Sequence, residues 1–221
     1  SKSGCDLQTC IICKGCLPEW KSAIASHRQI FHFKKNEQIF AEGEELRGIY
    51  FLMEGIAKVH KHWGPEKELV VRFARSGEIL GHRGLGKDVF YPVSATALEP
   101  VTACYFPIDF FLATLRVNHS LTYDLMMFYA SELKESERKM TNLVHMPVKG
   151  RLAYTLVFLQ EKFGVDMEGF VDILLTRQDL ASFAGTTYET AFRMFSEMQA
   201  EGAVIFEKKH FRILDMGKMQ S

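Results

Sequence analysis

The sequence lacks any long apolar run and carries no net charge. Its 221 residues balance 27 Lys and Arg against 27 Asp and Glu, and no apolar stretch reaches the roughly 20 residues that a transmembrane helix needs. No positively charged segment leads into an apolar core near the N-terminus, so we expect no secretion signal, no membrane partner and a cytoplasmic location. With balanced charge, any nucleic-acid contact would depend on a few well-placed residues.

Motifs of common enzyme classes are also missing. The chain has no P-loop, no nucleophile elbow and no His-Glu-x-x-His pattern. The glycine-rich stretch GEILGHRGLG does not open a helix after a strand, as a dinucleotide-binding loop would. We therefore expect a protein that is not an enzyme.

Residues 31–107 contain a set of short β-rich segments. Stretches such as IYFLMEG, IAKVHKHW, KELVVRFA and VTACYF are separated by glycine turns, and WGPE at residues 63–66 is typical of a hairpin tip. Many short strands with frequent turns predict an antiparallel β-roll of the jelly-roll type. With the helices that follow, the fold class is α+β.

A long helix is predicted over residues 108–144. Six residues follow coiled-coil spacing and form what we call the apolar seam: Met126, Tyr129, Leu133, Ser136, Met140 and Leu143. The charged residues 134, 135 and 137–139 fall off the apolar seam and are expected to face solvent. The seam predicts a homodimer, although an amphipathic helix packed on its own domain would give a similar pattern. Met146-Pro147 ends the helix, and residues 148–163 form another.

The stretch TRQDLASFAGTTYETAFRMF, residues 176–195, predicts two short helices joined by a tight turn. Thr176 can cap the first helix with Asp179, Thr186 can cap the second with Glu189, and Gly185 allows the turn. Apolar residues at 180, 181, 184, 191, 194 and 195 hold the pair together. This is a helix-turn-helix, which lays its second helix in a DNA major groove.

A β-hairpin follows this unit directly, in AVIFEKKHFRILD at residues 203–215. A hairpin at that place is a wing, whose Lys208, Lys209, His210 and Arg212 can contact phosphates. The partner predicted from the residues is a double-stranded DNA operator. Its predicted contacts are Thr176, Arg177, Thr187, Tyr188, Glu189, Thr190, Arg193, Lys208 and Lys209.

A glycine-rich β-roll, a long helix and a winged helix-turn-helix in this order resemble the Crp/Fnr family of bacterial transcription regulators. The specific pieces are FAEGEELRGIYFLMEGIAKV, GEILGHRGLG and LTRQDLASFAGTTYETAFRMFSEMQAEG. The resemblance implies a cysteine-rich segment at residues 1–16, a sensor roll of the cyclic-nucleotide-binding type at 17–110, a dimerisation helix at 111–145 and a DNA-binding domain at 146–221. It also implies contact with RNA polymerase.

The family resemblance implies base-reading roles for three residues of the second helix. Residues matching Glu189 and Arg193 read base edges, and Tyr188 occupies another base-facing position; Arg can donate two bonds to guanine and Glu can accept from cytosine. Phe192 replaces a small residue common among oxygen-sensing members. It either contacts a thymine methyl or turns inward.

The resemblance places an effector pocket around Gly81, Val93 and Ser94. Members that bind cyclic AMP hold its phosphate with an Arg-Ser pair, and Val93 stands at the arginine position here. An apolar side chain cannot pair with a buried anion, so cyclic AMP is not the expected effector. Haem is not expected either, although His60, His62 and His82 lie in the roll, because a lone His is more often a surface residue than a ligand.

Five cysteines remain to be explained. Cys5, Cys10, Cys13 and Cys16 form C-x4-C-x2-C-x2-C, and Cys104 stands apart. The resemblance to the Fnr branch implies Cys10, Cys13, Cys16 and Cys104 as ligands of a [4Fe–4S] cluster, with Cys5 as a substitute. The gap between Cys13 and Cys16 is shorter than its family counterpart. A zinc site, a disulfide and inert thiols remain alternatives.

The predicted regulator would then sense oxygen, nitric oxide or redox state. Four thiolates would fix the N-terminal segment on the roll beside the long helix and favour the dimer that aligns the DNA modules; loss of the cluster would release the segment. One alternative is a regulator of this family with another effector: haem, a small molecule or a cyclic nucleotide. Another class is a redox or metal-binding protein without DNA function.

Overall fold

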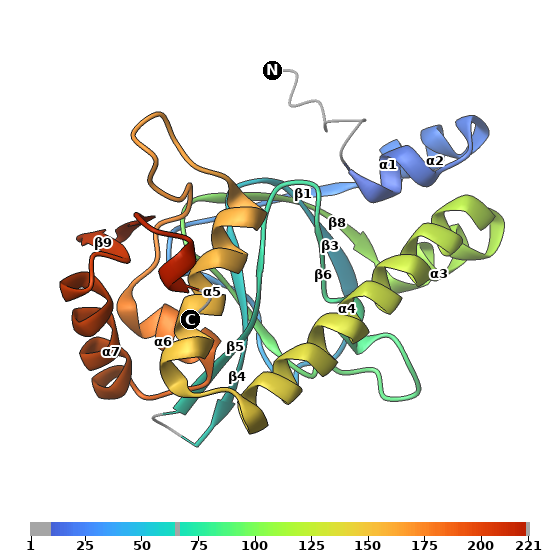
Figure 1. Cartoon of the computed structure of the whole chain (residues 1–221). Helices are drawn as coiled ribbons and strands as arrows, with labels where there is room; N and C mark the ends of the chain where they lie inside the picture. The colour runs from blue at the N-terminus through green and yellow to red at the C-terminus, as the bar shows by residue number, and fades with distance from the viewer. Residues whose placement is uncertain (1–9, 65–66, 220–221) are drawn as a thin grey trace. The chain divides into compact units, whose positions relative to one another are not determined.

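The structure of the protein, a computed structural model, describes residues 10–64 and 67–219 (Figure 1). The chain divides into two compact units. The first contains residues up to 61 together with 71–134, and the second contains residues 62–70 and the chain from 135 onward. Cys5 lies outside the described residues, and so do Pro65 and Glu66 of the predicted hairpin tip. None of the described helices is long and apolar enough to span a bilayer.

Two four-stranded sheets form the β-roll, and the pairs of neighbouring strands that can be followed residue by residue are antiparallel, which confirms the prediction. One sheet has the order β1 (Gln29–Phe33), β8 (Val101–Pro107), β3 (Gly48–Glu54) and β6 (Ile79–Leu80). The other has the order β2 (Gln38–Phe40), β7 (Ser94–Ala97), β4 (Ala57–Trp63) and β5 (Lys67–Ala74). A short 3₁₀ helix, η2 (His82–Gly84), follows β6.

Alternation along the strands fills the roll with large side chains. Ile49, Phe51, Leu80 and Phe106 are almost completely buried and share one hydrophobic core. Tyr91 is also buried, and its hydroxyl donates a 2.8 Å hydrogen bond to the Gly48 carbonyl. Satisfying that hydroxyl allows the aromatic ring to remain in the core.

The N-terminal part folds into α1 (Ile11–Gly15), η1 (Pro18–Trp20) and α2 (Lys21–His27). Gly15 permits close packing on the next helical layer: a Cβ there would lie 2.9 Å from the Leu121 Cα. The Trp20 Nε1–H donates to the Thr114 hydroxyl at 3.0 Å.

The helix predicted over residues 108–144 is interrupted. It is two helices, α3 (Ile108–Val117) and α4 (His119–His145), separated by Asn118 at φ −109° and ψ 80°. The fully buried Asn118 side chain donates to the Thr114 carbonyl at 2.8 Å. Asparagine competes with helical backbone bonds in this way, and periodicity of apolar residues does not reveal it.

The second unit contains α5 (Val148–Phe163), α6 (Arg177–Ala184), α7 (Tyr188–Ala200), β9 (Val204–Glu207), β10 (His210–Ile213) and η3 (Gly217–Met219). The prediction for residues 148–163 is confirmed. The expectation that residues 135 and 139 simply face solvent was wrong. Glu135 pairs with Arg138, and the Lys139 ammonium lies 3.6 Å from the centroid of the Phe183 ring, where the ring face attracts a cation.

Candidate DNA-binding face and cysteine site

The first helix of the helix-turn-helix, α6, begins with the predicted cap. The Asp179 N–H donates to the Thr176 hydroxyl at 3.0 Å, and the Thr176 N–H donates to the Asp179 carboxylate at 3.1 Å. This capping box satisfies two backbone donors that the first turn leaves open. Gly185 then ends α6 at φ 66°, the left-handed conformation expected for the turn.

Sequence reasoning missed Arg151, which fixes the turn from α5. Its guanidinium donates to the carbonyls of Ala184 at 3.0 Å, Gly185 at 3.2 Å and Met146 at 3.0 Å. The carbonyls at a helix C-terminus carry partial negative charge, so a cation is stabilising there. The position of an arginine on a neighbouring helix gave no indication of this role.

The predicted cap of α7 was wrong by one residue. The Thr186 N–H donates to the Ala181 carbonyl at 3.0 Å and so closes the end of α6. Thr187 is the cap: its backbone is extended at φ −77° and ψ 157°, and its hydroxyl accepts from the Thr190 N–H at 3.3 Å. Two adjacent threonines are equivalent in sequence, and only the turn geometry separates them.

The two faces of α7 differ as the motif requires. Ala191, Phe195 and Met198 are buried, whereas Tyr188, Glu189 and Arg193 are exposed. Phe192 also points outward, being 51% exposed, and its ring lies 6.1 Å from the Tyr188 ring. Of the two alternatives for Phe192, the inward one is excluded in this structure.

The wing is the β9–β10 hairpin, and its turn exposes Lys208 and Lys209. Two arginines near it are held by the protein itself. Arg177 donates to the Lys208 carbonyl at 3.0 Å with its guanidinium 4.7 Å from the centroid of Phe206, and Arg212 donates to the Glu168 carbonyl at 2.8 Å. These bonds fix the wing, and Lys208 and Lys209 remain exposed at its turn.

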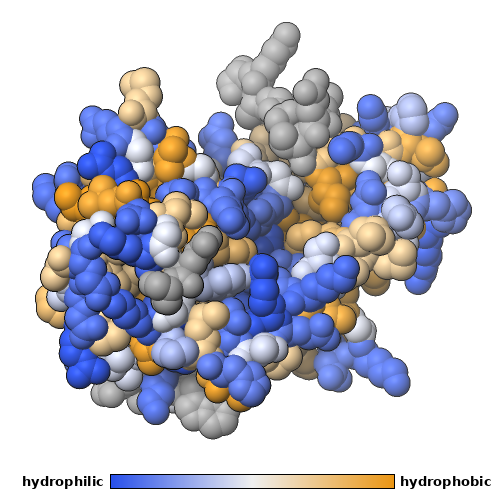
Figure 2. All heavy atoms as spheres, in the orientation of Figure 1, coloured by the Kyte–Doolittle hydropathy of each residue, from blue (hydrophilic) through white to orange (hydrophobic). Residues whose placement is uncertain are grey.

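The apolar seam lies on α4 and is largely exposed. Met126, Leu133 and Met140 are 56%, 60% and 56% exposed, respectively. Hydrophobic surface interrupts hydrophilic surface over the region of α4 in Figure 2. Large exposed apolar side chains at regular spacing are typical of a helix that pairs with another.

Two seam residues also contact their own chain. The Tyr129 hydroxyl donates to the His82 carbonyl. Leu143 packs on the turn of the helix-turn-helix, because a Cβ on Gly185 would lie 2.5 Å from its Cδ2. The C-terminal end of α4 is thereby fixed to the helix-turn-helix.

The described cysteines gather in the first unit. Cys10 caps α1, Cys16 ends it, and both are buried in the hydrophobic core that contains Cys104; Cys13 packs against that core. Burial first, and the nearby Cys10 second, raise the pKa of the Cys16 thiol to about 11, while Lys21 opposes the shift. With this raised pKa the Cys16 thiol stays protonated at neutral pH unless a bound cation stabilises its thiolate.

The geometry bears on what this group could hold. Among the described residues, no three cysteine sulfurs lie within 4.8 Å of one another. A single tetrahedral zinc would hold its sulfurs about 3.8 Å apart, whereas a [4Fe–4S] cluster spaces them more widely because each thiolate binds a different iron. The described cysteines therefore do not form the close group of sulfurs that a single zinc ion would hold.

The residues of the predicted effector pocket pack against other residues of the roll. Val93 is buried, the Ser94 hydroxyl accepts from the Glu42 N–H at 2.9 Å, and Gly81 faces Tyr91 closely. Neither Val93 nor Ser94 offers a charged partner to a phosphate. Of the histidines considered for haem, His82 is buried beside Phe128 and Tyr129, and His60 and His62 lie on β4.

Comparison with known proteins agrees with this architecture. Residues 30–118 match the Cyclic nucleotide-binding domain family, and residues 150–221 match the Crp-like helix-turn-helix domain family. The Anaerobic regulatory protein of Bacillus subtilis is 26% identical over 195 residues, covering 87% of this chain and 81% of that protein. The Transcriptional activator protein anr of Pseudomonas aeruginosa is 26% identical over 185 residues, covering 82% and 75%.

Solved structures share the fold. FixK2 from Bradyrhizobium japonicum superposes with a TM-score of 0.76 at 19% identity, covering 87% of this chain and 95% of that one. The c-di-GMP responsive regulator CLP from Xanthomonas campestris gives 0.77 at 19% identity, with 88% and 97% covered. A sensor-type roll, a long helix and a Crp-like helix-turn-helix thus occur in the order found in these regulators. Members of the Crp/Fnr family form dimers and act by binding DNA rather than by catalysis. The chain belongs to this family of transcriptional regulators.

Proposed function

We propose that this regulator binds its operator as a homodimer, with the exposed face of α7 in the major groove of each half-site. The observation that carries this proposal is the division of α7 into a packed face, containing Ala191 and Phe195, and an exposed face with Glu189 and Arg193. A two-fold dimer presents two such helices about one turn of DNA apart.

The proposed contacts divide by chemistry. Arg193 donates to guanine, Glu189 accepts from a cytosine amine, and Tyr188 with Phe192 offers apolar surface to a thymine methyl. Thr187 and Thr190 lie at the start of α7, where backbone N–H groups favour phosphate. Lys208 and Lys209 neutralise phosphates from the wing, and Thr176 and Arg177 support these contacts from α6.

The dimer forms along α4 in this proposal. Burying the exposed side chains Met126, Leu133 and Met140 against a second copy supplies the hydrophobic free energy of pairing. Dimerisation sets the half-site spacing, and contact with RNA polymerase converts operator binding into transcriptional control.

Binding to a selected operator, measured by gel shift at several salt concentrations, tests the DNA-binding proposal. A specific site should bind more tightly than random duplex at every salt concentration, and equal affinities would reject base reading.

We further propose that the effector is oxygen or nitric oxide, sensed through a [4Fe–4S] cluster held by Cys10, Cys13, Cys16 and Cys104. The shared burial of Cys10, Cys16 and Cys104 in one core supports this assignment. So does the similarity to a protein named for anaerobic regulation. When bound, the cluster supplies iron sites that react with these gases.

Contacts within the chain connect the cysteine segment to the dimer helix α4. Gly15 lets α1 approach Leu121, the Leu17 N–H donates to Asn118 at 2.7 Å, and Trp20 bonds Thr114. The cysteine segment is therefore attached at the α3–α4 break, directly before the apolar seam. Releasing the segment would remove these contacts and shift the dimer population.

An absorption spectrum of protein purified without oxygen, with iron and acid-labile sulfide measured on the same sample, tests the effector. Visible absorbance with about four irons and four sulfides per chain is expected from the cluster composition. Admission of air should bleach the absorbance and weaken operator binding together. Colourless, iron-free protein that binds its operator equally with and without air would reject the sensor while leaving the DNA-binding proposal standing.

A further inference from the structure

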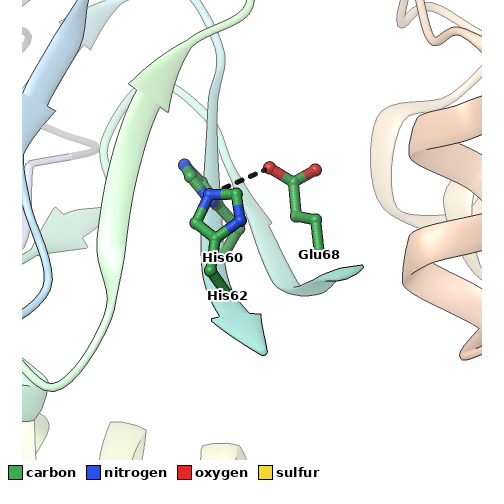
Figure 3. A group of neighbouring side chains, drawn as sticks. All are labelled: His60, His62 and Glu68. Atoms are coloured by element: carbon green, nitrogen blue, oxygen red, sulfur yellow. Dashed lines mark ion pairs between the residues drawn. The ribbon is translucent and has the colours of Figure 1, made fainter. Parts of the chain in front are cut away.

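Two histidines and a glutamate converge on the β4–β5 hairpin. Figure 3 shows the imidazoles of His60 and His62 on β4 and the carboxylate of Glu68 on β5. One ligand atom from each of the three residues lies within 4.8 Å of the other two. His60 and His62 are two residues apart in one strand and point to the same side, so strand geometry itself brings the rings together.

The three residues differ in exposure in a way that favours ion binding. His60 is 4% exposed, and its Nε2 lies 2.9 Å from the Thr96 hydroxyl on β7. A hydrogen bond on one ring nitrogen fixes the orientation of a ligating imidazole, and it assigns Nδ1 of His60 as the ligand atom. The His62 side chain is 51% exposed and can rotate toward a bound ion.

Glu68 adds a negatively charged carboxylate to the two imidazoles. Its carboxylate lies 3.8 Å from Nε2 of His62, and its side chain is only 17% exposed. An exposed His–Glu ion pair alone contributes little to stability. A carboxylate beside two imidazoles matches the His₂Glu set that binds zinc with a fourth position open to water.

We infer that the hairpin binds one Zn²⁺ through His60, His62 and Glu68. Tetrahedral zinc with bonds of about 2.0–2.2 Å holds its ligand atoms roughly 3.4 Å apart. The observed group is looser, and rotation of the exposed His62 with a small movement of Glu68 closes it. Imidazole and carboxylate donors also suit other first-row divalent ions, so zinc is distinguished by its tetrahedral preference.

The bound ion joins two neighbouring strands close to the hairpin turn. It replaces a weak ion pair by bonds to both strands and thereby restricts the hairpin. The site is independent of the cysteine cluster and of the effector proposal, since it shares no residue with either.

Zinc binding to the full-length reduced protein tests this inference, by equilibrium dialysis against ZnCl₂ and by chemical shifts of the imidazole nitrogens. The exposed variant His62→Gln and the variant Glu68→Gln should each bind one ion per chain fewer than the parent. His32→Gln is the matched control: His32 also lies on a strand with a threonine hydroxyl, that of Thr102, at 3.2 Å from its Nδ1. It should bind as the parent does.

The parent, His62→Gln, Glu68→Gln and His32→Gln all keep their cysteines. Any zinc bound by cysteine is therefore the same in all four and does not affect the differences in stoichiometry. In the parent, zinc should shift the ring nitrogens of His60 and His62 and leave those of His32 unchanged. Thr96→Val should keep the ion but lower its affinity by roughly 10-fold through loss of ring orientation. Equal stoichiometry in His62→Gln and the parent, or retention of the ion in Glu68→Gln, would overturn the three-residue site.

Discussion

The side-chain oxygen of Asn118 accepts a 2.7 Å hydrogen bond from the backbone N–H of Leu17, 101 positions earlier in the chain. Cys16 and Leu17 are adjacent, so this bond fixes the end of the cysteine segment at the start of α4. Asn118 also caps the break between α3 and α4 through its bond to Thr114. One buried side chain thus joins the proposed sensor segment to the proposed dimer helix.

Replacing Asn118 by alanine should release this junction. Two hydrogen bonds are lost, one buried and one partly buried, so the free energy of unfolding should fall by about 1–3 kcal/mol. Amide hydrogen exchange of α1 should increase by more than that of β3. Asn142→Ala, near the C-terminal end of the same helix, is the control and should leave α1 exchange unchanged. Unaltered α1 protection in Asn118→Ala would show that the segment is held by other contacts.

Arg193→Ala should weaken binding to a specific operator by about 1–3 kcal/mol, because a bidentate contact to guanine is lost. Arg193 is exposed on α7, so the substitution should leave the stability of the fold unchanged. Fluorescence anisotropy on operator and on random duplex measures the difference. Gln199→Ala, in the last turn of α7, should bind both as the parent does. An equal loss on random DNA would assign Arg193 to a phosphate rather than to a base.

Cys104→Ser should abolish the visible absorbance of protein purified without oxygen, because a hydroxyl is a poor ligand for iron. Cys104 is 2% exposed in the core shared with Cys10 and Cys16. Cys5→Ser is the matched change and should keep the absorbance, since Cys5 is the spare thiol in this assignment. Retained colour in Cys104→Ser would remove Cys104 from the ligand set.

Leu133→Asp should give monomers in sedimentation velocity runs. The leucine is 60% exposed on α4, and a carboxylate in a paired apolar seam would be buried without a partner in both copies. Lys134→Asp introduces the same residue one position away, off the apolar seam, and should remain dimeric. A dimeric Leu133→Asp protein would place the interface elsewhere.

Acidification should destabilise the roll through His82. Burial, with the positive charges of Arg72 and Arg83 as smaller causes, lowers its pKa well below 6.5. Below pH 6.5 His82 takes up a proton in the unfolded chain but not in the folded protein. The contribution of His82 to the free energy of unfolding is therefore fully present above that pH and is lost as the pH falls.

The decline is measured by urea unfolding between pH 7 and pH 5. His82→Gln removes this contribution, so its loss of stability over that interval should be smaller than that of the parent by up to about 2 kcal/mol. His32→Gln, at an exposed position, should follow the parent. Parallel pH profiles for His82→Gln and the parent would mean that the pKa of His82 is the same in the folded and the unfolded protein.

Much of the fold was predictable because local sequence dictates it. Glycine turns between β-rich stretches predicted the roll, and the spacing of Leu180, Ala184, Ala191 and Phe195 predicted the helix-turn-helix. The capping box of Thr176 and Asp179 formed as expected, since both partners lie within one turn of α6. The β9–β10 wing and the α5 helix also followed from short-range pattern.

The features that the sequence did not reveal share one cause. The break at Asn118, the cap at Thr187, the bonds of Arg177 and the clamp from Arg151 each depend on a contact with another element or on backbone geometry at a turn. Apolar periodicity records which face of a helix is buried, but it does not record which carbonyl a guanidinium will find.

The sequence by itself determined the order of the elements, the outward face of α7 and the supply of thiols, because each depends on the character and spacing of nearby residues. Tertiary structure alone decided that Cys104 joins Cys10 and Cys16 in one core, that Leu17 bonds Asn118, and that Glu68 reaches the two histidines of β4. These associations join distant residues or neighbouring strands, and only the folded backbone fixes the distance between them.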